Sequence, residues 1–207
     1  QSDGSRARGI GRYSLEIIKN IIVQFPEHNI ILVSNSALKD LDIDLKDYLM
    51  YENVSFVKWY SPCPFDFISG NKTKTKLAIY LKSYTYSCLN PDVILITSFF
   101  EGYSDNCLVD FDRDFIKAPI VSIFYDLIPL INPDLYLRDN PGFKKFYMSK
   151  IRKLKGVDGL LAISQSSANE ASDILGIDQS KVYNISSGCD KKVFNNNAQK
   201  IIFNNEN

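Results

Sequence analysis

Apolar residues recur at helical spacing near the start of the chain and then form a short unbroken run. The spaced positions predict a helix with a wide buried stripe, and they are Leu15, Ile17, Ile18, Ile21, Ile22 and Phe25. The pattern breaks at Pro26 and Asn29. Residues 30–33 are all apolar and are followed by Ser34 and Asn35, which is typical of a buried parallel strand.

The same alternation continues to residue 185. Short apolar runs predict further strands over residues 54–59, 93–96, 120–124, 159–163 and 182–185. Helical patterns cover residues 76–89, 143–154 and 164–175. Asn90 and Pro91 stop the first of these helices, Ser164 or Ser166 is placed to cap the last, and Gly176 ends it. Alternating helices and apolar strands predict an α/β fold with a Rossmann-like, doubly wound parallel sheet.

Composition narrows the classes of function. The 207 residues balance 24 Lys and Arg against 24 Asp and Glu, whereas a dedicated nucleic-acid binder normally has a basic excess. The four cysteines have no C-x-x-C spacing, which argues against a structural zinc site and fits a reducing cytoplasm. The only histidine, His28, falls in a helix-to-strand turn, far from the serines at strand ends, which argues against Ser-His-Asp hydrolysis.

The sequence shows neither a signal peptide nor a run of about eighteen apolar residues. We therefore expect a cytoplasmic protein that is soluble or rests on a membrane surface. Residues 143–155 combine an apolar stripe with a cationic face, and such helices can rest on anionic lipid. This segment is a candidate for peripheral contact with the inner face of the membrane. The alternative is a helix that covers the sheet and has a solvated basic face.

Two glycines stand just before the first predicted helix, in the segment Gly9, Ile10, Gly11 and Arg12. Small residues there let a ligand approach the backbone, and the free amides at the positive end of a helix favour an anion such as a diphosphate. The segment matches a dinucleotide fingerprint only in part, because the acidic residue expected about twenty positions later is absent. This argues against an NAD-dependent oxidoreductase. The alternative is a glycine turn needed only for packing.

Polar residues follow three predicted strands at their carboxyl ends, which is the edge where ligands bind in open α/β sheets. Glu101 and Gly102 follow the third predicted strand, Asp126 the fourth, and Ser164 and Gln165 the fifth. Two carboxylates on one edge suit general acid–base chemistry or the binding of sugar hydroxyls. The alternatives are a solvated loop charge for Glu101, a loop-capping role for Asp126 and a helix-capping role for Ser164.

Several short segments, in their order and spacing, resemble the N-terminal domain of glycosyltransferase family 4, which has the GT-B architecture. They are Ser5-Arg6-Ala7-Arg8-Gly9-Ile10-Gly11-Arg12-Tyr13-Ser14, Asn90-Pro91-Asp92-Val93, Ser98-Phe99-Phe100-Glu101-Gly102, Tyr125-Asp126-Leu127-Ile128-Pro129-Leu130, Asn132-Pro133-Asp134-Leu135-Tyr136-Leu137, Leu161-Ala162-Ile163-Ser164-Gln165-Ser166-Ser167 and Gly188-Cys189-Asp190. The resemblance covers nearly the whole chain and looks closest to the mannosyltransferase-like, polysaccharide-building branch. It implies retaining transfer of a sugar from a nucleotide-sugar donor to a glycan or lipid-linked acceptor, with neither a metal nor a further cofactor.

The resemblance also implies roles for individual residues. Residues 9–12 would face the donor diphosphate. The Asp126 region would line the acceptor pocket near the reacting carbon, with Tyr125 at the position where many relatives have a histidine, so these two are the candidate catalytic residues. The remaining contacts with substrate would come from Glu101, Gly102, Ser164 and Gln165.

The same resemblance implies a division of the chain. Residues 1–190 would form the acceptor-side domain, and residues 191–207 would be a linker or the start of a donor-binding domain. A glycine loop of this kind normally follows a strand, so we expect that the first strand of the domain is missing. The 207 residues alone are then expected to lack transferase activity. The alternative is a non-catalytic Rossmann-like module that binds a glycan or a protein.

Overall fold

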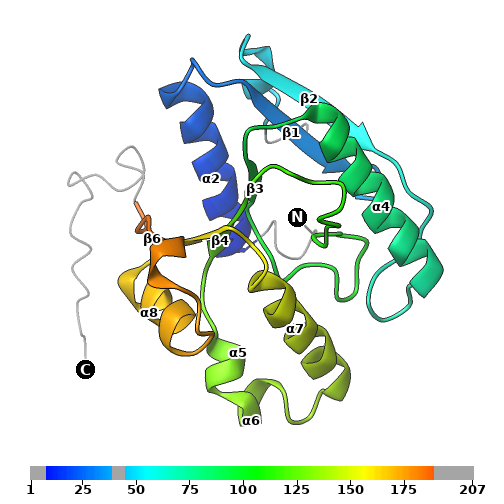
Figure 1. The fold of residues 1–207 in the computed structure, drawn as a ribbon, viewed down its shortest axis with the longest axis vertical. Coiled ribbons are helices and arrows are strands. Elements are labelled where there is room, and N and C mark those ends of the chain that lie inside the picture. The colour runs from blue at the N-terminus through cyan, green and yellow to red at the C-terminus, as the bar shows by residue number, and fades with distance from the viewer. Residues whose placement is uncertain (1–7, 39–44, 189–207) are drawn as a thin grey trace, which may run out of the picture.

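The computed structural model describes residues 8–38 and 45–188 and confirms the α/β class (Figure 1). Its longer helices are α2 (Gly9–Gln24), α4 (Lys72–Leu89), α7 (Pro141–Leu154) and α8 (Gln165–Asp173). Its short helices are α5 (Ile128–Ile131), α6 (Pro133–Tyr136) and the 3-10 turns η1 (Tyr48–Met50) and η2 (Gln179–Lys181). The strands are β1 (Ile30–Asn35), β2 (Val54–Trp59), β3 (Ile94–Ile96), β4 (Ile120–Phe124), β5 (Gly159–Ala162) and β6 (Val182–Asn184). The segment predicted as a linker, 191–207, lies outside the described residues.

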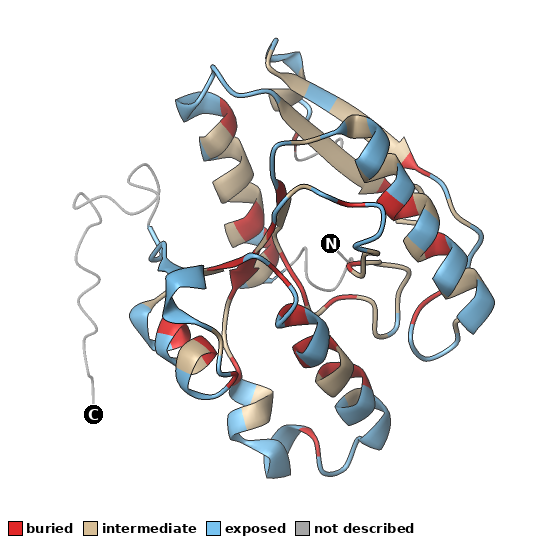
Figure 2. Cartoon of the chain, viewed as in Figure 1, coloured by how far each residue is buried: buried red, intermediate tan, exposed pale blue. Residues whose placement is uncertain are grey.

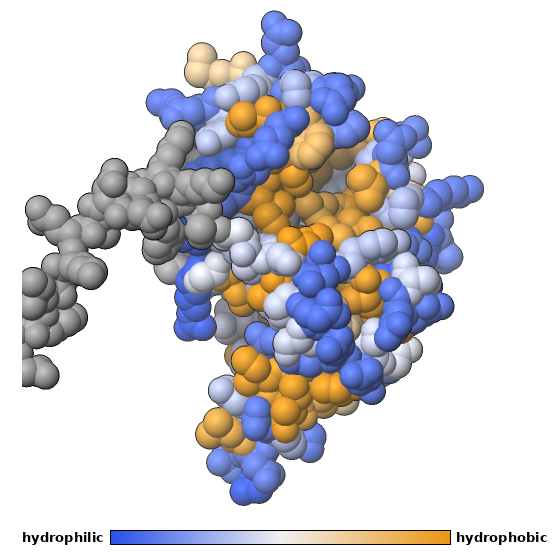
Figure 3. Space-filling model, turned by 90° about the vertical axis from the view of Figure 1, so that its left-hand side faces the viewer, coloured by the Kyte–Doolittle hydropathy of each residue, from blue (hydrophilic) through white to orange (hydrophobic). Residues whose placement is uncertain are grey.

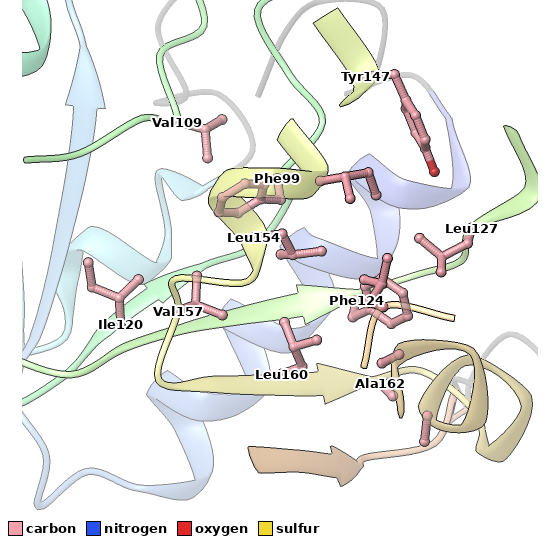
Figure 4. Close-up of a cluster of buried hydrophobic side chains, with 14 of the residues drawn as sticks. Phe99, Val109, Ile120, Phe124, Leu127, Tyr147, Leu154, Val157, Leu160 and Ala162 are labelled. Atoms are coloured by element: carbon pink, nitrogen blue, oxygen red, sulfur yellow. The ribbon is translucent and has the colours of Figure 1, made fainter. Parts of the chain in front are cut away.

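All described strands are parallel, but they divide between two sheets instead of forming one. β1 pairs with β2, in a register that runs from Ile30 opposite Val54 to Asn35 opposite Trp59. The second sheet has the order β3-β4-β5-β6. Figure 4 shows α7 in front of this sheet and α2 behind it, so helices cover both of its faces, as the doubly wound prediction requires.

The boundaries of β2 to β6 agree with the predicted strands to within one residue. Two helices begin earlier than predicted because an asparagine caps each of them. The Asn71 side chain accepts hydrogen bonds from the amides of Thr73 and Lys74 before α4, and the Asn140 side chain accepts one from Phe143 within α7. The helices α5 and α6 were not predicted, since each has a proline in its first turn that interrupts the helical pattern.

The main hydrophobic core lies between the four-stranded sheet and the helices α7 and α8 (Figure 4). Its strand residues include Ile120, Phe124 and Leu160, and Leu154 of α7 packs onto them with no exposed surface. Full burial of one such side chain stabilises the fold by about 1.5–3 kcal/mol. This core fixes the carboxyl ends of β4 and β5, where predicted site residues lie.

The first sheet is buried far less well (Figure 2). Ile22 is the only large apolar residue of α2 that is fully buried, and residues 30–33 of β1 are half-buried. Figure 3 shows apolar side chains at the surface at the level of α2 and this sheet. An all-apolar parallel strand is normally covered on both faces. Among the described strands, β1 pairs only with β2, and β3 pairs only with β4.

A long connection between β3 and β4, residues 97–119, joins the two parts of the molecule. Lys82 of α4 donates hydrogen bonds to the backbone carbonyls of residues 108–110, at 2.9, 2.8 and 3.2 Å. Lys150 of α7 binds the side chain of Asp110 at 3.1 Å. Both lysines are buried. A helix from each part therefore holds the same connecting segment.

Candidate functional site

The amino end of α2 lies against the carboxyl ends of β3 and β4. The Tyr125 hydroxyl is within hydrogen-bonding distance of Ser14 Oγ at 3.0 Å, the Thr97 carbonyl at 3.1 Å and the Ile10 carbonyl at 3.3 Å. Ser14 Oγ also donates to the Thr97 carbonyl, at 3.2 Å. The ring of Tyr13 meets that of Tyr125 edge to face, with centroids 5.9 Å apart. The predicted glycine segment and Tyr125 therefore share one rim of the molecule.

The Tyr125 hydroxyl faces α2, so this side chain positions the start of the helix. Burial raises the pKa of Tyr125, and the hydrogen bond with Ser14 offsets this only in part, so the hydroxyl is protonated at neutral pH. A catalytic role for Tyr125 remains a prediction.

Replacing Tyr125 with phenylalanine should lower the free energy of unfolding by about 1–2 kcal/mol, because partly buried groups lose a hydrogen-bond partner. Urea unfolding followed by circular dichroism measures the change. Tyr183→Phe is the matched control, since Tyr183 is 56% exposed. Equal stability of the two variants would show that the hydroxyl does not hold α2 in place.

Glu101 is buried in the loop after β3, so the solvated-charge alternative is wrong. Only 4% of the residue is exposed, and its Oε1 accepts a hydrogen bond from Ser98 Oγ at 2.7 Å. The next residue, Gly102, has φ +91°, and its carbonyl accepts a hydrogen bond from the amide of Phe67 at 3.0 Å. The loop after β2 is thereby joined to the loop after β3.

Asp126 and Ser164 lie at the ends of the neighbouring strands β4 and β5, as predicted. Asp126 Oδ1 accepts a hydrogen bond from the amide of Ile128 at 3.0 Å, which is the loop-capping role. Ser164 caps α8, with its Oγ accepting from the amide of Ser167 at 3.1 Å. Ser167 Oγ in turn donates to the carbonyl of Tyr125. The start of α8 is therefore fastened to the strand end that carries Asp126.

The end of β6 also lies at this rim, a position that was not predicted from the sequence. The exposed Gln165 accepts a hydrogen bond on Oε1 from Asn184 Nδ2 at 3.2 Å. The Tyr13 hydroxyl donates to the carbonyl of Ser186 at 2.9 Å. Asn184 and Ser186 thus add polar groups beside α2 and α8. No local pattern marks them, because their place depends on the strand order.

Two further residues near Asp126 were also missed. Glu170 of α8 accepts a hydrogen bond from the amide of Leu127 at 2.8 Å. Tyr147 of α7 is 3% exposed, and its hydroxyl has no hydrogen-bond partner in the described part of the chain. Burial raises the pKa of Tyr147, and the charges of Asp126 and Glu170 raise it further. In the sequence, Tyr147 is marked only as part of an apolar stripe.

Taken together, the rim combines backbone amides at a helix start with carboxylates and hydroxyls at strand ends. Such a set can bind an anion and sugar hydroxyls. The exposed Arg12 adds a positive side chain at the start of α2. In residues 8–38 and 45–188, no group of three or more His, Cys, Asp or Glu residues is placed to hold a metal ion. Cys63, Cys88 and Cys107 are free thiols, and Cys189 lies outside the described residues.

The helix α7 covers the sheet with its apolar stripe, so its cationic face is the part that is left for contact with solvent or lipid. Its stripe of Phe146, Tyr147, Ile151 and Leu154 is buried. The remaining face is exposed and cationic, with Lys144, Lys145, Arg152, Lys153 and, just beyond the helix, Lys155. Within the described residues, every helix is too short or too polar to pass through a bilayer.

The chain is similar to three Escherichia coli proteins, each named serotype-specific mannosyltransferase WbdA. Two are 32% identical to it, over 188 and 172 residues, and the third is 31% identical over 188 residues. The matches cover 88%, 81% and 87% of this chain but 22%, 21% and 23% of those proteins. The chain therefore spans about a fifth of the length of the curated relatives it matches. No protein-family model and no solved structure matches it. This similarity supports a relationship to glycosyltransferases.

Proposed function

We propose that residues 1–190 form the N-terminal, acceptor-side domain of a retaining glycosyltransferase of family 4. One observation carries this proposal. The start of α2, Glu101, Asp126 and Ser164 all gather where parallel strands end, which is the ligand-binding edge of such folds. The similarity to proteins named mannosyltransferases supports mannose as the transferred sugar, and we propose that the donor is its nucleotide-activated form.

Each part of the rim has a place in the proposed reaction. The amides of residues 9–11 and the side chain of Arg12, whose own amide donates to the Arg8 carbonyl, bind the donor diphosphate and stabilise the charge that grows on the leaving phosphate, with no metal required. Asp126 accepts a hydrogen bond from the acceptor hydroxyl near the reacting carbon. Tyr125 holds the start of α2 next to Asp126. The acceptor pocket, for a glycan or a lipid-linked glycan, is lined by Gly102, Ser164 and Gln165. The buried Glu101 supports the loop that carries Gly102 through its hydrogen bond with Ser98.

Donor binding in this architecture comes mainly from a second domain. We therefore propose that residues 1–207 bind an acceptor glycan but do not transfer sugar by themselves.

We further propose a cytoplasmic protein that contacts the inner face of the membrane through residues 143–155. The exposed cations of α7 would attract anionic lipid. The lower end of the molecule in Figure 3 adds apolar surface where Figure 1 has α5 and α6. There Ile128, Ile131 and Leu135 are exposed. This arrangement suits an enzyme that acts on a lipid-linked acceptor.

Titration calorimetry and a transfer assay test the proposed function together. Residues 1–207 should bind α-linked mannotriose in the millimolar range and should bind NAD not at all. The same protein should transfer no label from radiolabelled GDP-mannose to mannotriose. Asp126→Asn should weaken mannotriose binding by about tenfold to a hundredfold, since a hydrogen bond to a charged group contributes about 1.5–3 kcal/mol.

Asp134→Asn is the matched control, because Asp134 is exposed on α6 and pairs with Arg138. It should leave mannotriose binding unchanged. Sugar transfer by the 207 residues alone would contradict the proposed division of labour. If Asp126→Asn binds mannotriose as tightly as the original protein does, the non-catalytic binding module is favoured instead.

A further inference from the structure

A row of aromatic rings extends from the neighbourhood of Asp126 to the protein surface. Its members are Tyr147, Phe143, Tyr103 and Phe67, and we call them the aromatic row. Their successive ring centroids are 6.0, 5.3 and 6.1 Å apart. The inner end is the buried Tyr147. At the outer end Phe67 is 39% exposed, and its neighbour Ile68 is 62% exposed.

The outer end of the row is held firmly. The amide of Phe67 donates to the Gly102 carbonyl at 3.0 Å, and the amide of Ile68 donates to the Tyr103 carbonyl at 3.1 Å. Asp66 closes the turn by accepting hydrogen bonds from the amide and the hydroxyl of Ser69, both at 2.7 Å. The exposed apolar side chains are therefore presented by an ordered loop at the carboxyl ends of β2 and β3.

The inner end of the row has a polar group whose state does not depend on the exposed rings. The Tyr147 hydroxyl is buried and has no hydrogen-bond partner among the described residues. Unsatisfied buried hydroxyls are rare in folded proteins, because they cost about 1–3 kcal/mol. Tyr103, between the two ends, places its hydroxyl 3.2 Å from Asn140 Oδ1 at the start of α7. The row thus combines ring faces with polar groups along its length.

We infer that the aromatic row is a glycan subsite, in which one face of Phe67 stacks on a pyranose ring of the acceptor. This inference rests on the proposed acceptor-side function. A pyranose presents an apolar face of C–H groups with hydroxyls around its edge, and the negative face of an aromatic ring attracts such C–H groups. Asn140 and Ser104, both exposed, lie beside the row in sequence and offer partners for the hydroxyls.

The size of the exposed surface favours a sugar over a protein. A stable protein partner requires about 800 Å² on each side of an interface. Among the described residues, the outer end of the row exposes Phe67 and Ile68, and two such side chains suit one or two sugar rings. At the inner end, Tyr147 lies close enough to Asp126 for that charge to raise the pKa of its hydroxyl.

Saturation-transfer NMR on residues 1–207 with α-linked mannotriose tests this inference. Phe67→Leu keeps an apolar side chain but removes the ring face, and it should weaken binding about fivefold to tenfold. Phe67→Tyr restores the face and should bind like the original protein. Tyr84→Leu makes the same kind of change on α4, at a residue that is 59% exposed, and should have no effect. Thermal unfolding of each variant shows that it is folded.

The outcomes separate this inference from the proposed function. If mannotriose binding depends on Asp126 but is the same in Phe67→Leu, the aromatic row is not a subsite, and the acceptor-side function stands. If Phe67→Leu and Phe67→Tyr bind equally weakly, a ring face is not what is recognised, and the inference fails. If the unaltered chain binds no mannotriose, the subsite and the acceptor-side function fail together.

Discussion

Replacing Gly102 with alanine should lower the free energy of unfolding by about 3 kcal/mol. Gly102 has φ +91°, a conformation that costs a residue with a Cβ about 1–3 kcal/mol. A Cβ at this position would also lie 2.2 Å from the carbonyl oxygen of Cys107. The backbone must shift to relieve that overlap. Overpacking of this kind typically costs a further amount of about 1–3 kcal/mol. Urea unfolding gives the change in free energy.

Gly176→Ala separates the two causes. Gly176 also has a positive φ, +67°, but a Cβ added there would have no other atom within 4 Å. This variant should lose only about 1–2 kcal/mol, the conformational part. The difference between the two variants measures the close approach to Cys107. Because the Gly102 carbonyl also binds the amide of Phe67, Gly102→Ala should weaken glycan binding as well. Equal losses in both variants would contradict this explanation.

Replacing Lys82 with methionine should lower the free energy of unfolding by about 4 kcal/mol. The residue is 4% exposed, and its ammonium group donates hydrogen bonds to three backbone carbonyls. Methionine has a similar length, so packing is largely kept, but the carbonyls lose their donor inside the protein. Each buried group left without a partner costs about 1–3 kcal/mol. Guanidinium unfolding measures the loss.

Lys153→Met is the matched control, because Lys153 also pairs with Asp110 but its side chain is 46% exposed. Solvent screens the charge of an exposed lysine, so its pair contributes about 1 kcal/mol or less, and Asp110 keeps its ion pair with Lys150. This variant should therefore remain close to the original protein. A small effect in both variants would show that Lys82 does not hold the connection at 97–119.

The pH dependence of the free energy of unfolding should show whether Lys82 is responsible for this stabilisation. Burial lowers the pKa of Lys82 to about 8, although the charge of Asp110 offsets part of that effect. The ordinary value is 10.5, so between these two values the unfolded chain holds more protons than the folded one. Stability should therefore rise with pH across this window, by up to about 1.4 kcal/mol per pH unit. In Lys82→Met the rise should be absent.

Most of the fold could be predicted because apolar runs mark buried strands whatever their neighbours are. The early start of α4 was hidden because its first turn, from Lys72 to Thr75, is polar and depends on the cap at Asn71. The division into two sheets was hidden for a different reason. Strand order is set by contacts between distant segments, such as those of Lys82 and Lys150 with residues 108–110.

The location of the candidate site was predictable, but its internal contacts were not. A strand followed by a polar loop is enough to assign Asp126 and Ser164 to the carboxyl edge. The burial of Glu101 and the inward direction of the Tyr125 hydroxyl depend on how α2 and the loops pack in three dimensions. The same holds for Tyr147, whose significance lies in a hydroxyl that finds no partner among the described residues.

The separation of β1 from β3 has a consequence for handling the purified protein. Each of these strands has one side on which no described strand continues the ladder, and half-buried isoleucines and valines lie nearby. Unpaired backbone donors and acceptors beside apolar side chains are templates for pairing with another molecule. Concentrated solutions should therefore be prone to self-association, and a short β-branched peptide that occupies the open side would act as a solubilising additive.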